Sequence, residues 1–203
     1  ARRDGDGHWL RLAIHRDQAA VRLQKAADLS GLGTGAIRWV AAGPGQRMDT
    51  AALRRQIRAD RDAGFRPFMA VATAGTVSTG AVDDLATIGA ICREEGLWFH
   101  VDGAYGAPAA ALEELAPEFA GMSDADSIAM DPHKWLYSPL EAACALVRDP
   151  AHLVDAFSFK PAYYHFDLGD REGLNYYEYG IQNSRGFRAL KVWLALKQVG
   201  AEA

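Results

Sequence analysis

Short apolar segments alternate with amphipathic helical segments along most of the chain, and this alternation restricts the fold more than any other feature. The apolar segments have the composition of buried strands, and they are residues 36–42, 67–73, 97–102, 127–130 and 142–147. The segments with apolar residues at helical spacing are residues 17–29, 48–64, 82–96 and 184–200. Strands buried on both faces and separated by helices indicate an α/β fold with a mostly parallel sheet and helices on both faces.

Residues at the ends of these segments support the assignment. Asp49 stands where a helix N-cap is expected, and Gly64 and Gly96 follow helical segments, where glycine commonly ends a helix. The motif GLGTG at residues 31–35 follows a helix and precedes a strand. A dinucleotide-binding turn has the opposite order, so we interpret these glycines as a helix end and a turn.

The overall composition is that of a globular protein. The chain has 203 residues, of which 49% are apolar, and a net charge of −4 with both signs mixed along its length. This balance argues against a nucleic-acid partner, and the lack of a long apolar stretch or a secretion signal argues against a membrane partner. Cys92 and Cys144 each lie in an apolar run, which favours buried thiols in a reducing compartment. We therefore expect a cytoplasmic protein.

Three strand ends carry the residues that suggest chemistry. In parallel α/β sheets, ligands bind at the carboxyl ends of the strands. The segments that follow predicted strands there are residues 73–79, 102–105 and 131–134. Lys134 follows an apolar run and precedes Trp135. Its side chain could lie along the surface with its ammonium in water, or its amine could act as a nucleophile toward carbonyls.

Asp102 has two interpretations as well. It could cap the next helix, or it could be the partner of a positive charge. Considered together, Asp102 and Lys134 suit a pyridoxal phosphate site, where a lysine forms a Schiff base with the aldehyde and a carboxylate keeps the pyridine nitrogen protonated. A metal site at His100 is not supported by ligand spacing, and we interpret His100 as pointing to the opposite face of its strand.

Motifs in the order found here extend this argument. The segments TAGTVSTGAVDDL, LWFHVDGAYG and DPHKWL, together with IQNSRGFRALKVWLALKQVG near the end, resemble the group II pyridoxal-phosphate-dependent amino acid decarboxylases. This family includes the aromatic-L-amino-acid, histidine and glutamate decarboxylases. The resemblance implies an aspartate-aminotransferase-like (fold type I) large domain, pyridoxal 5'-phosphate as cofactor, and decarboxylation of an L-amino acid substrate to the amine.

The resemblance also implies roles for single residues. Lys134 would be the Schiff-base lysine, Asp102 the partner of the pyridine nitrogen, and Ala104 the small residue beneath the ring. Tyr176 falls near the tyrosine of the family's mobile loop, which is thought to protonate the carbanion after carbon dioxide departs. Tyr177 is an adjacent candidate for that role.

Three further residues are assigned to the cofactor by the same resemblance. His133 and Asp131 would lie near the phosphate and its anchoring loop, and Thr76 would lie in the cofactor-binding turn. The stretch 160–180, rich in tyrosine, glycine and charge, is either a functional loop or a solvated connection. Trp193 and its apolar neighbours in the last helical segment are expected in the core.

The chain departs from the family in two ways. Ala20 stands where the family has a histidine that stacks on the pyridine ring. The chain is also short, so we expect residues 1–203 to be the central part of the large domain, without an N-terminal segment and a small C-terminal domain. The resemblance implies a homodimer or a complement that supplies these segments. Aldehyde formation, another carbon–carbon lysis and a non-catalytic paralogue or assembly module remain alternatives to decarboxylation.

Overall fold

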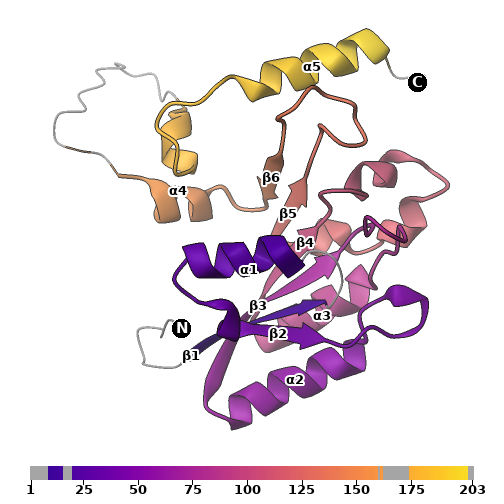
Figure 1. Cartoon of the computed structure of the whole chain (residues 1–203), viewed down its shortest axis with the longest axis vertical. Helices are drawn as coiled ribbons and strands as arrows, with labels where there is room; N and C mark the ends of the chain where they lie inside the picture. The colour runs from indigo at the N-terminus through magenta and orange to yellow at the C-terminus, as the bar shows by residue number, and fades with distance from the viewer. Residues whose placement is uncertain (1–8, 16–19, 160, 162–173, 201–203) are drawn as a thin grey trace.

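The computed structural model describes residues 9–15, 20–159, 161 and 174–200, and its centre is one six-stranded sheet (Figure 1). The strand order is β2-β1-β3-β4-β5-β6. The strands are β1 (Trp9–His15), β2 (Ile37–Val40), β3 (Phe65–Thr73), β4 (Trp98–Asp102), β5 (Ser127–Met130) and β6 (Cys144–Val147). Adjacent strands are parallel except for β6, which runs antiparallel to β5 at one edge. The predicted, mostly parallel sheet is therefore confirmed.

Helices connect most of the strands, and the first three of them in chain order pack against the sheet. The helices are α1 (Ala20–Leu29), α2 (Thr50–Asp62), α3 (Leu85–Glu95), α4 (Ala151–Phe157) and α5 (Arg188–Val199). Short 3-10 helices are η1 (Thr34–Ala36), η2 (Pro44–Gln46), η3 (Ala107–Ala111), η4 (Ala116–Phe119), η5 (Met122–Asp124) and η6 (Tyr176–Tyr179). Asp49 caps α2 by accepting from two backbone N–H groups, and Gly96 ends α3 with a φ of 61°, as predicted. Within the described residues, no helix has both the length and the apolar character needed to cross a membrane.

The hydrophobic core lies on both faces of the sheet. On one face, α2 and α3 bury Leu53 and Ile88 against Phe99 and Val101 of β4. On the other face, α1 contributes Ala27 to a smaller cluster with residues of β2 and β3. Burying each large apolar side chain contributes about 1.5–3 kcal/mol, so the larger cluster supplies most of the stabilisation of the sheet.

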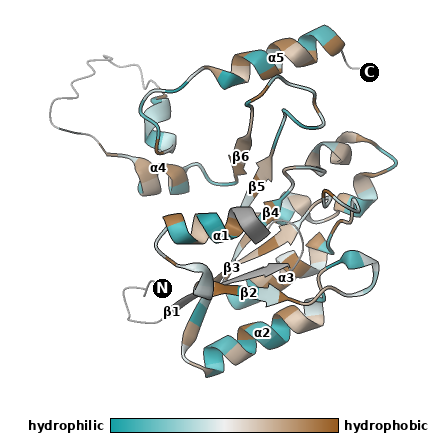
Figure 2. Cartoon of the chain, viewed as in Figure 1, coloured by the Kyte–Doolittle hydropathy of each residue, from teal (hydrophilic) through white to brown (hydrophobic). Residues whose placement is uncertain are grey.

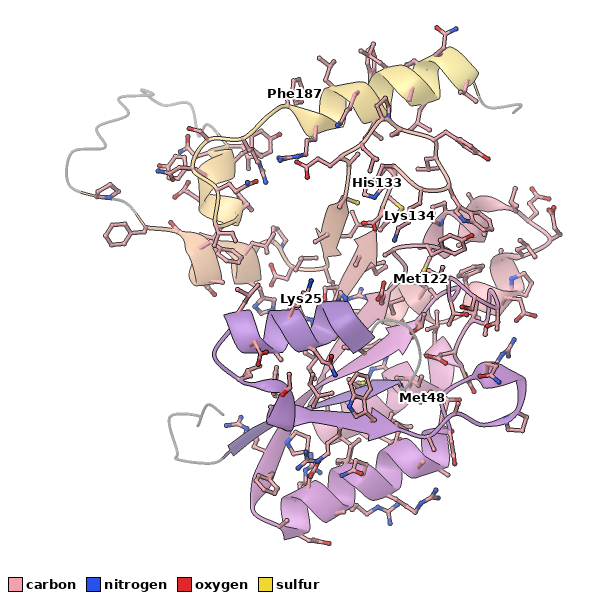
Figure 3. All side chains as sticks on the ribbon, in the orientation of Figure 1. Lys25, Met48, Met122, His133, Lys134 and Phe187 are labelled. Carbon is pink, nitrogen blue, oxygen red and sulfur yellow. The ribbon has the colours of Figure 1, made fainter. Side chains whose placement is uncertain are left out.

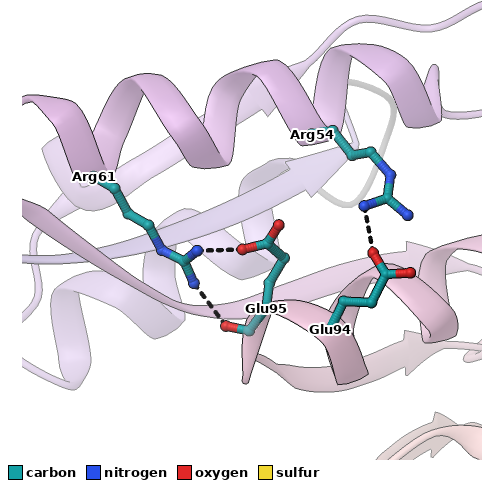
Figure 4. Close-up of polar contacts among 4 residues, drawn as sticks. All are labelled: Arg54, Arg61, Glu94 and Glu95. Carbon is teal, nitrogen blue, oxygen red and sulfur yellow. Dashed lines mark hydrogen bonds and ion pairs between the residues drawn. The ribbon is translucent and has the colours of Figure 1, made fainter.

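Ion pairs on the surface link α2 to α3 (Figure 4). Arg54 lies 2.5 Å from the carboxylate of Glu94, and Arg61 binds both the carboxylate and the backbone carbonyl of Glu95. Exposed pairs of this kind contribute only about 0–1 kcal/mol each, so they orient the two helices more than they stabilise them.

Helix α5 lies at the end of the molecule beyond β6, away from the two core clusters (Figure 1). Apolar residues stand along it between polar ones (Figure 2), and none of its residues is buried. Trp193 is 56% exposed, so the prediction that it lies in the core is wrong. An apolar stripe along a helix indicates that the helix packs against something, but not against what. Among the described residues, no residue of α5 is buried by another element.

Candidate active site

The loops after β3, β4 and β5 meet at the carboxyl edge of the sheet. The strand register places Thr73 of β3 opposite Asp102 of β4, and Asp102 opposite Ala129 of β5. Lys134 follows the end of β5 by four residues and lies beside His133 at this edge (Figure 3). The structure therefore brings together the three segments that the sequence analysis selected.

Asp102 uses one carboxylate oxygen to hold the loop that follows it. Its side chain is half-buried, and its Oδ1 accepts a hydrogen bond from the backbone N–H of Ala104 at 3.1 Å. Among the described residues, its Oδ2 has no hydrogen-bond or ion-pair partner. Ala104 itself is 7% exposed, so a small side chain lines the backbone next to the acid. The second oxygen can accept a bond from a protonated nitrogen of a ligand.

Two glycines let the loops after β3 and β4 pack backbone against backbone. A Cβ on Gly75 would lie 2.6 Å from the Cα of Gly106, and Gly75 has a φ of 84°. No other residue fits this contact without moving one of the loops. The close approach holds the turn that carries Thr76 against the loop that follows Asp102.

Lys134 is held by an acid three residues before it. Its Nζ lies 2.7 Å from Oδ2 of Asp131, whose side chain is largely buried. His133 lies beside this pair, with Nε2 at 3.9 Å from the same oxygen. Nδ1 of His133 accepts a hydrogen bond from the backbone N–H of Ala142 at 3.0 Å, which fixes the orientation of the ring. The amine is thus fixed in a polar contact at the edge of the sheet.

A pocket of about 570 Å³ opens beside Lys134, and aromatic side chains line it. Within the described part of the chain, its lining residues are Tyr105, Lys134, Trp135 and Tyr137. The rings of Tyr105 and Trp135 meet edge to face, with their centroids 5.3 Å apart. Tyr105 belongs to a segment selected from the sequence and Trp135 was noted beside Lys134, but neither they nor Tyr137 were assigned a role. The available signal was their position one to three residues after Asp102 and Lys134.

Thr76 and Tyr176 differ in their positions relative to this pocket. Thr76 is buried, and its hydroxyl accepts from the N–H of Ala81 at 3.2 Å and lies 2.7 Å from the hydroxyl of Thr79. Tyr176 is 65% exposed in η6, which packs against α4, and it is not among the pocket-lining residues. The functional roles assigned to Thr76 and Tyr176 stay predictions.

The sequence analysis also missed Asp83, which is 3% exposed behind the site. Its carboxylate accepts from the backbone N–H of Thr73 at 2.8 Å and from that of Met48 at 2.7 Å. The sequence feature that could have revealed Asp83 is the pair of acids, Asp83 and Asp84, directly before α3. Asp84 caps the helix by accepting from Thr87, which leaves the first acid to turn inward. Asp83 thereby fixes the end of β3 next to Asp102.

His100 lies on the same face of β4 as Asp102, so the prediction that it points to the opposite face is wrong. Side chains two positions apart in a strand share a face, and the core residues Phe99 and Val101 occupy the other one. Burial lowers the pKa of His100 below its usual value, while the negative charge of Asp102 acts in the opposite direction. The uncharged imidazole is therefore the dominant form near pH 7.

Comparison with known proteins identifies the family that has this arrangement. The family described as "Pyridoxal-dependent decarboxylase conserved domain" matches residues 11–203. The chain belongs to this decarboxylase family. The family resemblance inferred from the motifs is thereby confirmed, and pyridoxal phosphate is the cofactor associated with the family.

Members of the decarboxylase family are similar in sequence to most of this chain. The aromatic-L-amino-acid decarboxylase of Bacillus atrophaeus is 43% identical over 158 residues, which are 77% of this chain and 33% of that protein. The phenylacetaldehyde synthase of Petunia hybrida is 35% identical over 187 residues, which are 91% of this chain and 37% of that protein.

The crystal structure of Oryza sativa TDC with PLP and tryptamine superposes with a TM-score of 0.87 at 31% identity, over 95% of this chain and 40% of that one. The match confirms the predicted fold class. The chain spans between a third and two fifths of the length of these relatives.

Proposed function

We propose that this chain forms the cofactor-binding part of an enzyme that decarboxylates an L-amino acid to the amine with the help of pyridoxal 5'-phosphate. Membership of the decarboxylase family supports this proposal. The observation that carries it is the position of Asp102 and Lys134, an acid and an amine at the carboxyl ends of two neighbouring parallel strands.

The donor groups present fit this cofactor. Pyridoxal phosphate, when bound, supplies a protonated ring that withdraws electrons from the α-carbon of the substrate. Lys134 would hold it through the amine, and the available oxygen of Asp102 would accept the ring N–H. The small side chain of Ala104, next to that carboxylate, leaves room for a flat ring. Asp131 and His133, in the loop after β5, are proposed for the phosphate side. Thr76, in the loop after β3, is proposed for the turn that binds the cofactor.

Asp131 also has a role before the cofactor arrives. Its carboxylate forms the ion pair with the amine of Lys134, at 2.7 Å, and both side chains are largely shielded from water. The pair keeps the amine in place at the edge of the sheet. Because a charged amine is not a nucleophile, Lys134 must give up a proton and leave Asp131 before it can bond to a carbonyl carbon.

Aromatic L-amino acids are the substrates that the pocket favours. Tyr105 and Trp135 present ring edges and faces beside Lys134, and Tyr137 extends this aromatic lining. Rings of this kind bind an aromatic side chain by offset or edge-to-face contacts, worth about 0.5–1.5 kcal/mol beyond area burial. Tyr176, or Tyr177 beside it, is proposed to deliver the proton that replaces the lost carboxyl group.

A homodimer is proposed as the functional form. The exposed apolar residues of α5, among them Trp193 at 56% exposure, give the chain a surface that a second subunit or another segment of the protein would cover. Two predictions stay untested: that residues 1–203 are the central part of the large domain, and that the protein is cytoplasmic.

The experiment is a substrate panel on the full-length protein that contains this chain. Purified protein with added cofactor is expected to release carbon dioxide and amine from L-tyrosine, L-DOPA or L-tryptophan, and less from L-glutamate. Lys134→Ala is expected to abolish both products. Lys25→Ala, which changes an exposed lysine on α1 (Figure 3), is the matched control and is expected to keep wild-type activity. Full activity of the Lys134→Ala variant would refute the proposal.

Aldehyde formation is the second candidate. It is favoured by Ala20, where the resemblance leads us to expect a histidine, and by the similarity to the phenylacetaldehyde synthase of Petunia hybrida. Such a reaction consumes dioxygen and water and releases carbon dioxide, ammonia and hydrogen peroxide with the aldehyde. Peroxide without amine in the same assay would therefore select this candidate, and amine without peroxide would exclude it.

A further inference from the structure

A small hydrogen-bonded cluster lies on the Asp102 face of the sheet and has no part in the function proposed above. Trp98 and His100 of β4 stand on this face, and Ser127 of β5 is the cross-strand neighbour of His100. The indole Nε1 lies 2.8 Å from Oγ of Ser127, and Nδ1 of His100 lies 2.7 Å from the same oxygen. One hydroxyl therefore joins two rings.

The direction of these two hydrogen bonds follows from the chemistry of the groups. An indole N–H can only donate, so the Ser127 oxygen accepts from Trp98. Among the described residues, Nδ1 of His100 is the one partner left for the Ser127 hydroxyl proton. With Nδ1 as acceptor, all three groups are paired, and the proton of the neutral imidazole is on Nε2. A protonated Nδ1 would instead donate to the Ser127 oxygen and leave the hydroxyl proton without a partner among the described residues, so the cluster favours the uncharged ring.

The charge of His100 matters because Asp102 is two residues away on the same face. A cationic imidazole there would attract the Asp102 carboxylate and compete with the positively charged nitrogen of a bound ring. Among the described residues, Asp102 is the charged group whose field acts on His100. The other titratable group at the cluster is His152 of α4, whose ring meets that of Trp98 edge to face at 5.2 Å.

We propose that Ser127, held by Trp98, keeps His100 uncharged so that the carboxylate of Asp102 stays available to the cofactor. His100 and Ser127 are then positioning residues of the cofactor site. This inference rests on the proposed function, because it assigns the two residues to the site that Asp102 and Lys134 define.

The test measures cofactor affinity rather than turnover. Pyridoxal 5'-phosphate is titrated into the full-length apoprotein and followed by absorbance, from about pH 6 to about pH 8.5, a range that brackets the ordinary histidine pKa. Ser127→Ala removes the hydroxyl donor, so His100 gains a proton more easily. Loss of one such hydrogen bond is expected to weaken binding roughly threefold to tenfold at the acidic end, and the difference from wild type is expected to fade at the alkaline end.

Further variants separate this role from a merely structural one. Ser127→Thr keeps the hydroxyl and is expected to restore the wild-type pH profile. In the double variant with Ser127→Ala and His100→Gln, no imidazole can become charged, so the extra weakening at acidic pH is expected to disappear.

Equal affinity of Ser127→Ala and wild type at every pH would overturn the inference. A uniform loss at all pH values, shared by the double variant, would overturn it as well. Failure of the wild-type protein to bind the cofactor would instead overturn the proposed function itself, and this inference with it.

Discussion

Replacing Asp83 tests how the structure holds the end of β3 beside Asp102. The Asp83 carboxylate is 3% exposed and accepts hydrogen bonds from two backbone N–H groups, those of Thr73 and Met48. Asp83→Ala removes both acceptors. Asp83→Asn keeps the shape and one oxygen acceptor, and it turns an NH2 group toward the second backbone donor.

The expected cost follows from the number of donors left without a partner. A buried donor that loses its acceptor costs about 1–3 kcal/mol, so two of them cost about 2–6 kcal/mol. We expect about 3 kcal/mol for Asp83→Ala, because water can enter the space that the side chain leaves. Asp83→Asn, which loses one acceptor, is expected to cost about half as much. Since 1.4 kcal/mol is a tenfold change, the alanine variant should open locally about 100 times more often.

Amide hydrogen exchange followed by mass spectrometry measures this opening. Peptides that contain Thr73 and Met48 are expected to exchange faster by that factor in Asp83→Ala. Asp84→Ala, the neighbouring control, loses the cap of α3 and costs about 1 kcal/mol, so it should speed exchange near Thr87 and leave β3 unchanged. Unchanged exchange at Thr73 and Met48 in Asp83→Ala would refute the argument that this acid fixes the strand end.

Two further predictions concern packing and thiol chemistry. Gly75→Ala and Gly80→Ala both add a Cβ at positive φ, but only Gly75 would bring it within 2.6 Å of a backbone atom, while Gly80 has open space around it. Gly75→Ala should therefore lower the melting temperature and cofactor retention more than Gly80→Ala, and equal effects would contradict the loop contact. Burial raises the pKa of Cys92 to about 12, so its thiolate is scarce below that pH. Iodoacetamide near pH 8 should label Cys92 in the native protein more slowly than the less buried Cys144, and more slowly than in the unfolded chain; equal labelling would contradict its burial.

Strong local signals let the sequence predict most of the sheet. Segments corresponding to β3, β4 and β5 were found because their apolar runs end in polar residues, and α2 and α3 because Asp49 and Gly96 mark a helix start and a helix end. The first strand, β1, was missed because Trp9–His15 mixes polar with apolar residues and has no continuous apolar run. Helix α4, of seven residues, is too short to show a helical period.

The part of the candidate site that depends on strand order could be predicted from the sequence. The rule that ligands bind at the carboxyl ends of parallel strands selected both Asp102 and Lys134, and the structure places them after neighbouring strands; their shared role in one site stays a prediction. The contacts of Asp131 with Lys134 and the path that places Tyr137 in the pocket depend on loop geometry, which no periodic pattern encodes. His100 was assigned to the wrong face although strand alternation alone gives the correct one.

The most direct test of the account is to find the lysine that holds the cofactor. The full-length protein is loaded with pyridoxal 5'-phosphate, reduced with borohydride and digested, and the modified peptide is sequenced by mass spectrometry. A phosphopyridoxyl group is expected on Lys134, and a marked loss of label is expected in Asp102→Asn at limiting cofactor. Stoichiometric label on another lysine, such as Lys25 or Lys191, with Lys134 unmodified, would contradict it.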